Sequence, residues 1–510
     1  MSNIKFIDGG VCAPQGFTAN GMRVGIKASR KINDTALVYS EVPCNAAGVF
    51  TKNRVKSESV KITQKHLADG KAQAAIEISG NANTCTGPQG AENALRMAKA
   101  AAGALGIKTE DVMVYSTGVI GAQFDVTKVE ANINTLKAGL SKKGHEEARV
   151  AIMTTDTHYK ECAVEFTVGG KVCRMGTMCK GSGMIHINMG TMLSFITTDC
   201  AISSAMLDKA LHSSIEGTYN CVSVDGDTST NDTLIIMANG MAGNAEITAP
   251  GADYDAFLDA LNKMNTIMAK KIAADGEGAT RLVECNVHGA ASVESARALA
   301  KEIICSSLVK AAMFGADANF GRFLCAMGYS PIEFDPEKTS IWFTSKSGAN
   351  RYFENYDDFE VHGENLVQVY KDGVPMDFDE ELAKKIMSEQ AVEILVQCGE
   401  GNASGTAWGC DLTYDYVKIN GDLKQRLPGN VNISFPNTDA EEMLLKLDSQ
   451  GICASAGSAC SSGSSEPSHV LTAIGLDKNL VGGSLRLTFG EQNNIDEVKF
   501  LINVLERILG

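Results

Sequence analysis

The sequence has no run of about 18 apolar residues, which a helix needs in order to cross a membrane. Its first residues, MSNIKFIDGGV, lack a basic leader followed by an apolar stretch, so no secretion signal is predicted. There is no C-x-x-C pair among the 15 cysteines, which are therefore expected to be reduced thiols rather than a disulfide or zinc framework. We predict a cytoplasmic protein with no membrane partner and no metal site.

Positive charge is also scarce, because 46 Lys and Arg face 61 Asp and Glu and the formal net charge is −15. Nucleic acids and anionic membranes bind basic surfaces, and the Lys and Arg of this chain are scattered rather than clustered. Nucleic acid is therefore excluded as a partner. A small-molecule substrate is favoured.

The composition and the length indicate a large globular protein. Hydrophobic residues make up 44% and charged residues 21%, and 510 residues favour two or three domains at roughly 100–200 residues each. Helical segments alternate with short β-rich ones, which predicts an α/β protein of the layered α+β kind. We expect helices at 91–105, 205–214, 253–274 and 293–313, strands at 111–116, 148–153, 193–198 and 233–238, and a hairpin at 165–176 around Gly169 and Gly170.

A glycine-rich loop, KGSGMIHINMGTML, runs from Lys180 into an apolar segment that includes Thr191. Threonine is a weak nucleophile unless a base lies beside it, and an N-terminal threonine can use its own α-amino group, which titrates near 7.7–8.0. A glycine before the threonine frees the backbone for attack on the preceding carbonyl. Gly190 and Thr191 fit this chemistry, although a plain loop entering a strand fits the same residues.

Two other segments end apolar stretches with hydroxyl groups. YSTGVIG places Thr117 and Gly118 where a hydroxyl and a backbone donor could face a developing oxyanion, and MTTDT ends a predicted strand with Asp156. Both segments are also good turn sequences. A third segment, DGDTSTND at 225–232, lacks calcium-loop spacing and is interpreted as a polar loop that lines a site.

Nine segments together carry a resemblance to a known family. They appear in the order found in the ornithine/glutamate acetyltransferases of arginine biosynthesis, and the resemblance covers about residues 4–424. The segments are GGVCAPQGF, CNAAGVFTKN, ISGNANTCTG, STGVIG, MTTDT, KGSGMIHINMGTML, SVDGDTSTNDT, GADANFGR and AWGCDLTYDYVKING. The resemblance implies the self-cleaving ornithine acetyltransferase fold.

The resemblance also implies a role for particular residues. Thr191 would be the nucleophile, freed by cleavage between Gly190 and Thr191, while Thr117 and Gly118 would stabilise the oxyanion. Substrate would be bound by Thr154, Lys180, Thr191, Glu277 and Asn420. Lys180 is chemically suited to a carboxylate and Glu277 to the amino group of ornithine, although a solvated lysine and a helix-end glutamate are the plainer interpretations.

The chain departs from the family pattern in two places. Gly190 replaces the usual alanine before the nucleophile, which the added backbone freedom should allow. The family chain ends a few residues after the Asn420 motif, typically on a threonine, whereas here Leu423, Lys424 and Gln425 continue the chain. Gln425 therefore stands where the family has its terminal threonine, and the sequence leaves open whether that substrate contact is made.

The last part of the chain resembles a second family. RLPGNVNISFP, GICASAGSACSSGSSEPSHVLTAIGL and GSLRLTFGEQN are similar to the C-terminal part of the pyridoxal-phosphate-dependent cysteine desulfurases, over about residues 426–510. Cys460 matches their persulfide-forming cysteine, and Arg486 matches the arginine that holds the substrate carboxylate. A small α/β piece like the small domain of fold-type I enzymes is implied. The lysine and the large domain that grip the cofactor are missing, so pyridoxal phosphate is not expected.

We therefore predict three segments: an acetyltransferase α chain at 1–190, a β chain at 191–425 and a desulfurase-like fragment at 426–510. The expected reaction moves acetyl from N2-acetylornithine to glutamate through acetyl-Thr191, with acetyl-CoA as a further donor and no cofactor. A heterotetramer of two α and two β chains is implied. The alternatives are an N-terminal-nucleophile aminopeptidase or amidohydrolase that uses water, and a non-catalytic sulfur-transfer adaptor that acts through the tail.

Overall fold

The computed structural model describes most of the chain, which divides into two compact units, Met1–Asp411 and Leu412–Gly510. The described residues are 4–27, 32–186, 192–353, 363, 365–413, 418–419, 430–435, 438–456, 471, 476, 478–490 and 493–509. The predicted boundary near 425 lies outside them and stays a prediction.

The first unit contains a large mixed sheet, which has nine strands among the described residues. Neighbouring strands are antiparallel except for β9 with β11 and β4 with β5, which are parallel. In spatial order the strands are β1 (Lys5–Phe6), β6 (Lys160–Val168), β7 (Lys171–Lys180), β9 (Leu193–Thr198), β11 (Thr233–Ala238), β3 (Thr35–Phe50), β4 (Lys71–Asn81) and β5 (Val112–Val119), with β2 (Phe17–Met22) paired to β3.

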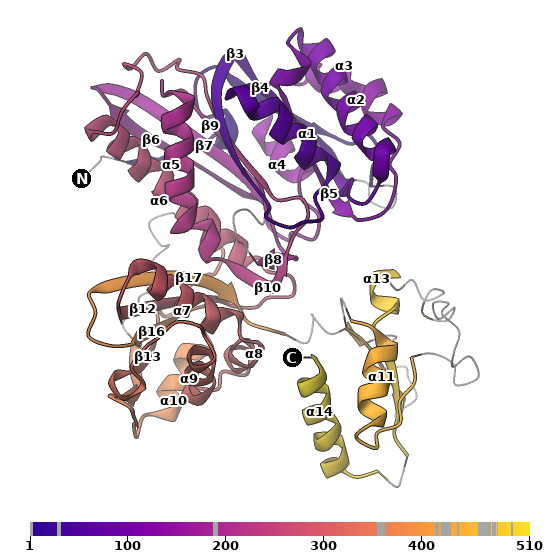
Figure 1. The fold of residues 1–510 in the computed structure, drawn as a ribbon, viewed down its shortest axis with the longest axis vertical. Coiled ribbons are helices and arrows are strands. Elements are labelled where there is room, and N and C mark those ends of the chain that lie inside the picture. Colours follow the sequence, from indigo (N-terminus) through magenta and orange to yellow (C-terminus); the bar gives the residue numbers. More distant parts are fainter. Residues whose placement is uncertain are drawn as a thin grey trace. The chain divides into compact units, whose positions relative to one another are not determined.

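Helices cover this sheet in two groups (Figure 1). α2 and α3 share a core with β4 and β5, whereas α6 packs on β6 and β7 and α5 packs on β3 and α6. Side-chain alternation explains the layering, because Ile76 and Ile78 of β4 pack with Met97 of α2 while Ala75 faces the opposite side. The helices are α1 (Glu58–His66), α2 (Gly87–Leu105), α3 (Thr127–Ala138), α4 (His145–Ala151), α5 (Ser204–Glu216) and α6 (Ala252–Ala274).

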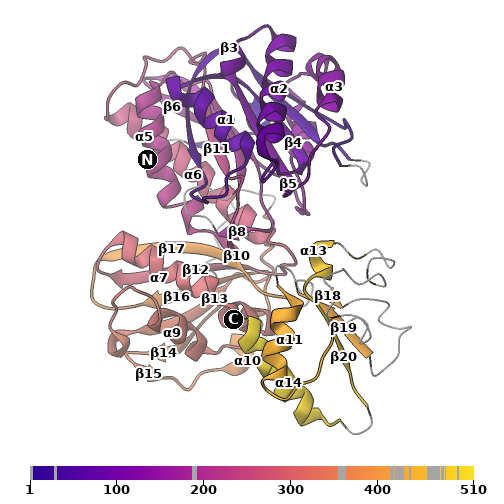
Figure 2. The same cartoon turned by 45° about the vertical axis from the view of Figure 1, so that its right-hand side comes forward.

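A second, six-stranded sheet completes the first unit (Figure 2). Its strands in spatial order are β15 (Val374–Pro375), β14 (Asn365–Lys371), β13 (Ser340–Ser345), β16 (Ala391–Gln397), β12 (Leu282–Ala290) and β17 (Ala403–Cys410). Its helices are α7 (Val293–Cys305), α8 (Ser307–Gly315), α9 (Phe320–Gly328) and α10 (Glu380–Met387). Helix α6 bridges the two sheets, because one core cluster joins Phe166 of β6, Met264 of α6 and Cys285 of β12.

A short two-stranded ribbon, β8 (Ile185–His186) with β10 (Ser223–Thr228), also belongs to this unit. The second unit has a three-stranded sheet among its described residues, ordered β18 (Lys418–Ile419), β19 (Asn430–Ser434) and β20 (Ser484–Thr488). Its helices are α11 (Ala440–Asp448), α13 (Lys478–Val481) and α14 (Ile495–Leu509). A core of nine buried residues joins α11, β20 and α14, including Leu447, Leu485 and Val504.

The structure confirms the mixed α/β class and several predicted elements, including the hairpin of β6 and β7 around Gly169 and Gly170. Two predictions were wrong. Residues 148–153 were expected to form a strand, yet His145–Ala151 is helix α4, which buries Ala148 and Ala151 on one face. MTTDT therefore follows a helix.

The second wrong prediction is a single helix over 293–313. The structure breaks it at Ser306, whose hydroxyl caps α8 by accepting from the Val309 N–H at 3.4 Å. Among the described residues, no helix is long and apolar enough to span a membrane.

Candidate active site

The ends of β4 and β5 form one edge of the site. Ser79 pairs with Thr117, and the register then shifts at Gly80 and Asn81. Gly118 has φ +132°, and a Cβ added there would collide with the backbone of Gly80 and Asn81. Only glycine therefore lets the strands approach so closely. Thr117 is buried and Gly118 is exposed.

Lys180 is the last residue of β7, and its side chain reaches the end of β5. Its Nζ donates a hydrogen bond to Thr117 Oγ1 at 3.3 Å, and the residue is 9% exposed. A hydroxyl group, an ammonium group and an exposed strand end thus meet in one place. Such a set of fixed donors suits a carboxylate or a developing oxyanion.

Asp156 joins the loop that carries Thr154 to the segment that follows Lys180. Its Oδ2 accepts from the Thr154 N–H at 3.0 Å, and its Oδ1 accepts from the Gly181 N–H at 2.8 Å. Burial would raise the pKa of Asp156, but Lys160, Lys180 and these hydrogen bonds outweigh it and hold the pKa well below its ordinary value. Asp156 is therefore ionised at neutral pH and fixes both segments.

A buried ionic network supports this loop from behind. Lys160 Nζ lies 2.7 Å from Asp156 Oδ1 and 2.5 Å from Asp275 Oδ2, and all three side chains are at most 2% exposed. Burial would lower the pKa of Lys160, but the two carboxylates outweigh it and raise that pKa above its ordinary value. Asp275 also accepts from the backbone N–H groups of Thr157 and His158. The network therefore holds residues 154–158 in place.

Glu277 follows this network in the chain. Its N–H donates to the Ser182 carbonyl at 3.0 Å, and its carboxylate lies so close to Gly183 that a Cβ at that glycine would clash with Oε2. The residue is exposed by area, yet surrounding protein atoms desolvate its carboxyl group and raise its pKa. Asp225 raises that pKa further, whereas Lys180 lowers it.

The structure thus brings together five of the predicted site residues, which are Thr117, Gly118, Thr154, Lys180 and Glu277. Gly190, Thr191, Asn420 and Cys460 lie outside the described residues. Met192, the first described residue after that gap, is buried, and its carbonyl accepts from the Thr233 N–H at 2.9 Å.

Arg486 lies in β20 of the second unit. Its backbone pairs with Ser455 in an isolated antiparallel bridge.

Sequence reasoning missed three ionisable residues near this site, which are Glu77, Lys160 and Asp275. Glu77 of β4 is 1% exposed, and neither carboxyl oxygen has a hydrogen-bond partner among the described residues. Burial raises the pKa of Glu77 well above its ordinary value, although Lys180 and Lys27 oppose this. An acid inside the apolar strand AAIEIS was an available signal. The pairing of Lys160 with Asp275, 115 residues apart, had none.

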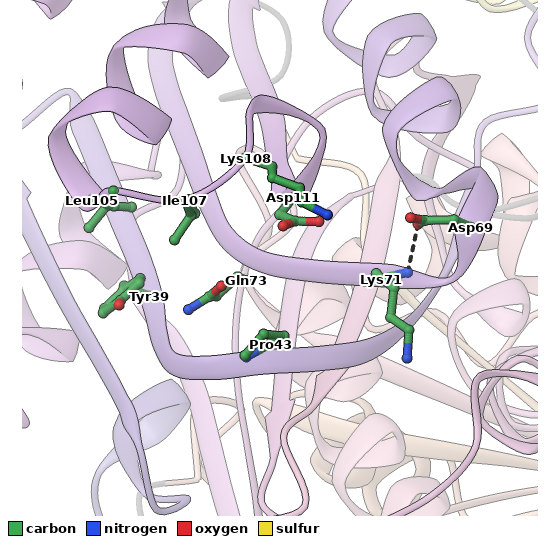
Figure 3. A pocket seen from close by; sticks show the side chains of 10 residues that line it. Tyr39, Pro43, Asp69, Lys71, Gln73, Leu105, Ile107, Lys108 and Asp111 are labelled. Atoms are coloured by element: carbon green, nitrogen blue, oxygen red, sulfur yellow. Dashed lines mark hydrogen bonds between the residues drawn. The ribbon is translucent and has the colours of Figure 1, made fainter.

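Two other features lie apart from this set. Within the described part of the chain, no group of three or more His, Cys, Asp or Glu could hold a metal ion. A surface pocket of about 760 Å³ lies where β3 and β4 meet the turn after α2, and it shares no residue with the predicted site (Figure 3). Its lining residues are Tyr39, Pro43, Asp69, Lys71, Gln73, Leu105, Gly106, Ile107, Lys108 and Asp111.

Comparison with known proteins agrees with the sequence resemblance. Residues 18–425 match the ArgJ family, and residues 412–501 match the class-V aminotransferase family. The arginine biosynthesis bifunctional protein ArgJ of Caldanaerobacter subterraneus is 47% identical over 421 residues, covering 82% of this chain and 100% of that protein. The protein of the same name from Symbiobacterium thermophilum is 46% identical over 424 residues, covering 82% and 100%.

Among solved structures, ornithine acetyltransferase from Mycobacterium tuberculosis, complexed with ornithine, matches 38% of this chain and 100% of that chain at 38% identity, with a TM-score of 0.33. The family match and the two bacterial relatives together cover most of the chain, and the tail resembles part of a class-V aminotransferase. From these matches we conclude that the chain belongs to the ArgJ family of arginine-biosynthesis enzymes.

Proposed function

We propose that this chain transfers an acetyl group from N2-acetyl-L-ornithine to L-glutamate through an acetyl-Thr191 intermediate. The observation that carries the proposal is the Lys180 to Thr117 hydrogen bond at 3.3 Å, which joins a carboxylate-binding cation to the expected oxyanion donor in a member of the ArgJ family. Self-cleavage between Gly190 and Thr191 is part of the proposal, because it supplies the α-amino group that serves as base.

In the first half-reaction, Thr191 Oγ attacks the acetyl carbonyl while the α-amino group of Thr191 takes the hydroxyl proton. The Thr117 hydroxyl and the Gly118 N–H stabilise the oxyanion. The amide C–N bond then breaks, and the same proton passes to the leaving amine of ornithine. Glutamate reverses these steps in the second half-reaction, in which its amine attacks the ester and frees Thr191.

Substrate recognition follows from charge. Lys180 suits the α-carboxylate, which both amino acids share, and Glu277 suits the side-chain ammonium of ornithine. Thr154 and Asn420 complete the proposed set. We further propose that acetyl-CoA also donates acetyl, that two α and two β chains assemble into a heterotetramer, and that the tail has no desulfurase activity of its own.

The test is single-turnover mass spectrometry of the wild-type protein. After purification, the chain should be in two pieces, and incubation with acetylornithine alone should add one acetyl group to the piece that begins at Thr191. Added glutamate should remove it and yield acetylglutamate. An intact 510-residue chain, or no covalent acetyl group, would overturn the proposal. Release of acetate to water in the presence of glutamate would instead identify an amidohydrolase.

A further inference from the structure

The proposed reaction requires one site to bind two side chains of opposite charge. Ornithine and glutamate share the α-amino and α-carboxylate groups, but the ornithine side chain ends in an ammonium group and the glutamate side chain in a carboxylate. In a ping-pong reaction both must occupy the same place beside the acetyl group. A permanently ionised Glu277 would attract the first side chain and repel the second.

A second carboxyl group, that of Asp225 in β10, contacts the same short segment that Glu277 contacts. Residues 183–185 run between them, with Gly183 against Glu277 and the backbone N–H groups of Met184 and Ile185 donating to Asp225 at 2.6 and 2.9 Å. We call Glu277 and Asp225 the acid pair. Glu277 is exposed by area, so a ligand can reach its carboxylate.

The charged groups that act on the acid pair come from three surrounding elements. Asp156 lies on the loop after α4, Lys180 ends β7, and Asp227 lies on β10 beside Asp225. Desolvation, Asp225 and Asp156 raise the pKa of Glu277, and Lys180 lowers it. Desolvation also raises the pKa of Asp225, against its backbone hydrogen bonds. The negative charge of Asp225 and the desolvation of Glu277 both favour the protonated form of the Glu277 carboxyl group, which therefore holds a proton more readily than an isolated acid.

We propose that the acid pair changes its protonation state between the two half-reactions and so lets one subsite bind both side chains. Glu277 is ionised when it meets the ornithine ammonium group. It carries a proton when it meets the glutamate carboxylate, to which it then donates a hydrogen bond. The proton enters from solvent with glutamate and returns to solvent before the next acetylornithine, so no other reactant is needed.

This inference rests on the proposed function, and two acetyl donors test it separately. N-acetylglutamate runs the second half-reaction backwards, so single-turnover release of the free amino acid can be measured from acetylornithine and from acetylglutamate with the same enzyme. The ratio of the two rates cancels titrations that both donors share, including that of the Thr191 amine. In the wild-type protein, this ratio of acetylornithine to acetylglutamate should rise with pH.

Glu277→Gln fixes a neutral hydrogen-bonding group at the acid pair. Acetylornithine should then bind about tenfold more weakly or worse, since one charge-assisted hydrogen bond is lost. Acetylglutamate should be affected much less, and the pH dependence of the ratio should flatten. Glu110→Gln, at an exposed position, is the matched control and should leave both donors unchanged.

Asp225→Asn provides a second readout. Removing this negative charge lowers the pKa of Glu277, so the acetylglutamate rate should fall at a lower pH than in the wild type, provided that thermal unfolding shows a folded protein. An equal loss of both donors in Glu277→Gln, or a ratio that does not vary with pH, would overturn the inference. Absence of release from either donor in the wild type would overturn the proposed function instead.

Discussion

The two compact units differ in how deeply charge is buried among their described residues. In Met1–Asp411, Lys160 is enclosed between two buried carboxylates. In Leu412–Gly510, the pair Lys446 and Glu442 lies one helical turn apart with both side chains about half exposed or more. Both units leave large apolar residues in solvent, and the two most exposed among the described residues, Leu445 at 73% and Ile495 at 66%, lie in the second unit.

This difference indicates which unit holds its polar groups rigidly enough for catalysis. A buried ion pair requires close geometry and further hydrogen bonds to offset the loss of water, and the network around Lys160 provides both beside the candidate site. In the second unit, nine buried apolar residues form one small core. Of the two desulfurase-like residues in this unit, the structure describes Arg486 but not Cys460. The segment that matches the class-V aminotransferase family spans only residues 412–501. We expect the first unit to carry the nucleophile and the oxyanion donors.

The largest expected difference between the units comes from their two nucleophile candidates. Thr191→Ala should prevent cleavage and lower acetyl transfer by several orders of magnitude, because the covalent route is lost. Cys460→Ala should change neither. Denaturing electrophoresis and an acetyl-transfer assay check both variants, and a loss of transfer in Cys460→Ala would remove the contrast.

The second largest expected difference between the units is in the free energy of unfolding that each loses when an ion pair is removed. Lys160→Met leaves two buried carboxylates without their cation and should cost about 3–5 kcal/mol of unfolding free energy. Lys446→Met removes an exposed pair and should cost less than about 1 kcal/mol. Urea unfolding, followed by a signal from each unit, measures both values. Equal losses of unfolding free energy in the two variants would show that the buried network stabilises the protein no more than the exposed pair does.

The same network predicts how stability depends on pH. Asp156 has a lowered folded pKa, so its contribution is present above its ordinary pKa of 3.8 and is lost as pH falls through the folded value. Lys160 has a raised folded pKa, so its contribution is present below 10.5 and is lost as pH rises through the folded value. Lys160→Met should flatten both flanks of the stability profile.

The oxyanion donor should give a smaller kinetic effect. Thr117→Ala should lower the rate of acetyl transfer by roughly 100-fold, the usual cost of losing one such donor. Cleavage should be followed in the same preparation, so that a lack of free Thr191 is not mistaken for slow transfer. Thr135→Ala, on the exposed side of α3, is the matched control. A Thr117 variant as fast as this control would contradict the assigned role.

The smallest effect concerns the predicted boundary near residue 425. Truncation after Gln425 should leave cleavage intact and modestly lower the KM for acetylornithine, because the chain near Asn420 is then released from the tail. Ending the chain with threonine at 425 should lower it further. The prediction fails if neither truncated protein binds acetylornithine better than the full chain.

Local patterns predicted a good part of the fold. The segments that became α5 and α6 were predicted as helices and those that became β9 and β11 as strands, and the structure has each within a residue or two of the prediction. The failures at α4 and Ser306 arose where tertiary burial and a single cap decided the outcome. The site divides similarly. Thr117 and Lys180 stand in recognisable motifs, whereas the contact of Lys160 with Asp275 depends on a fold that no local pattern encodes.

The order of strands in the large sheet has a consequence for the proposed cut. If the chain is divided before residue 191, β9 and β11 belong to the second piece, yet β7 on one side and β3 on the other belong to the first. The two pieces then interleave in one sheet. Six residue pairs join β11 to β3 and six join β9 to β7, which makes 12 pairs between the pieces. Neither piece can leave without opening the middle of the sheet. A severed molecule should therefore behave as one particle until it is denatured, and two separately made pieces should rejoin poorly.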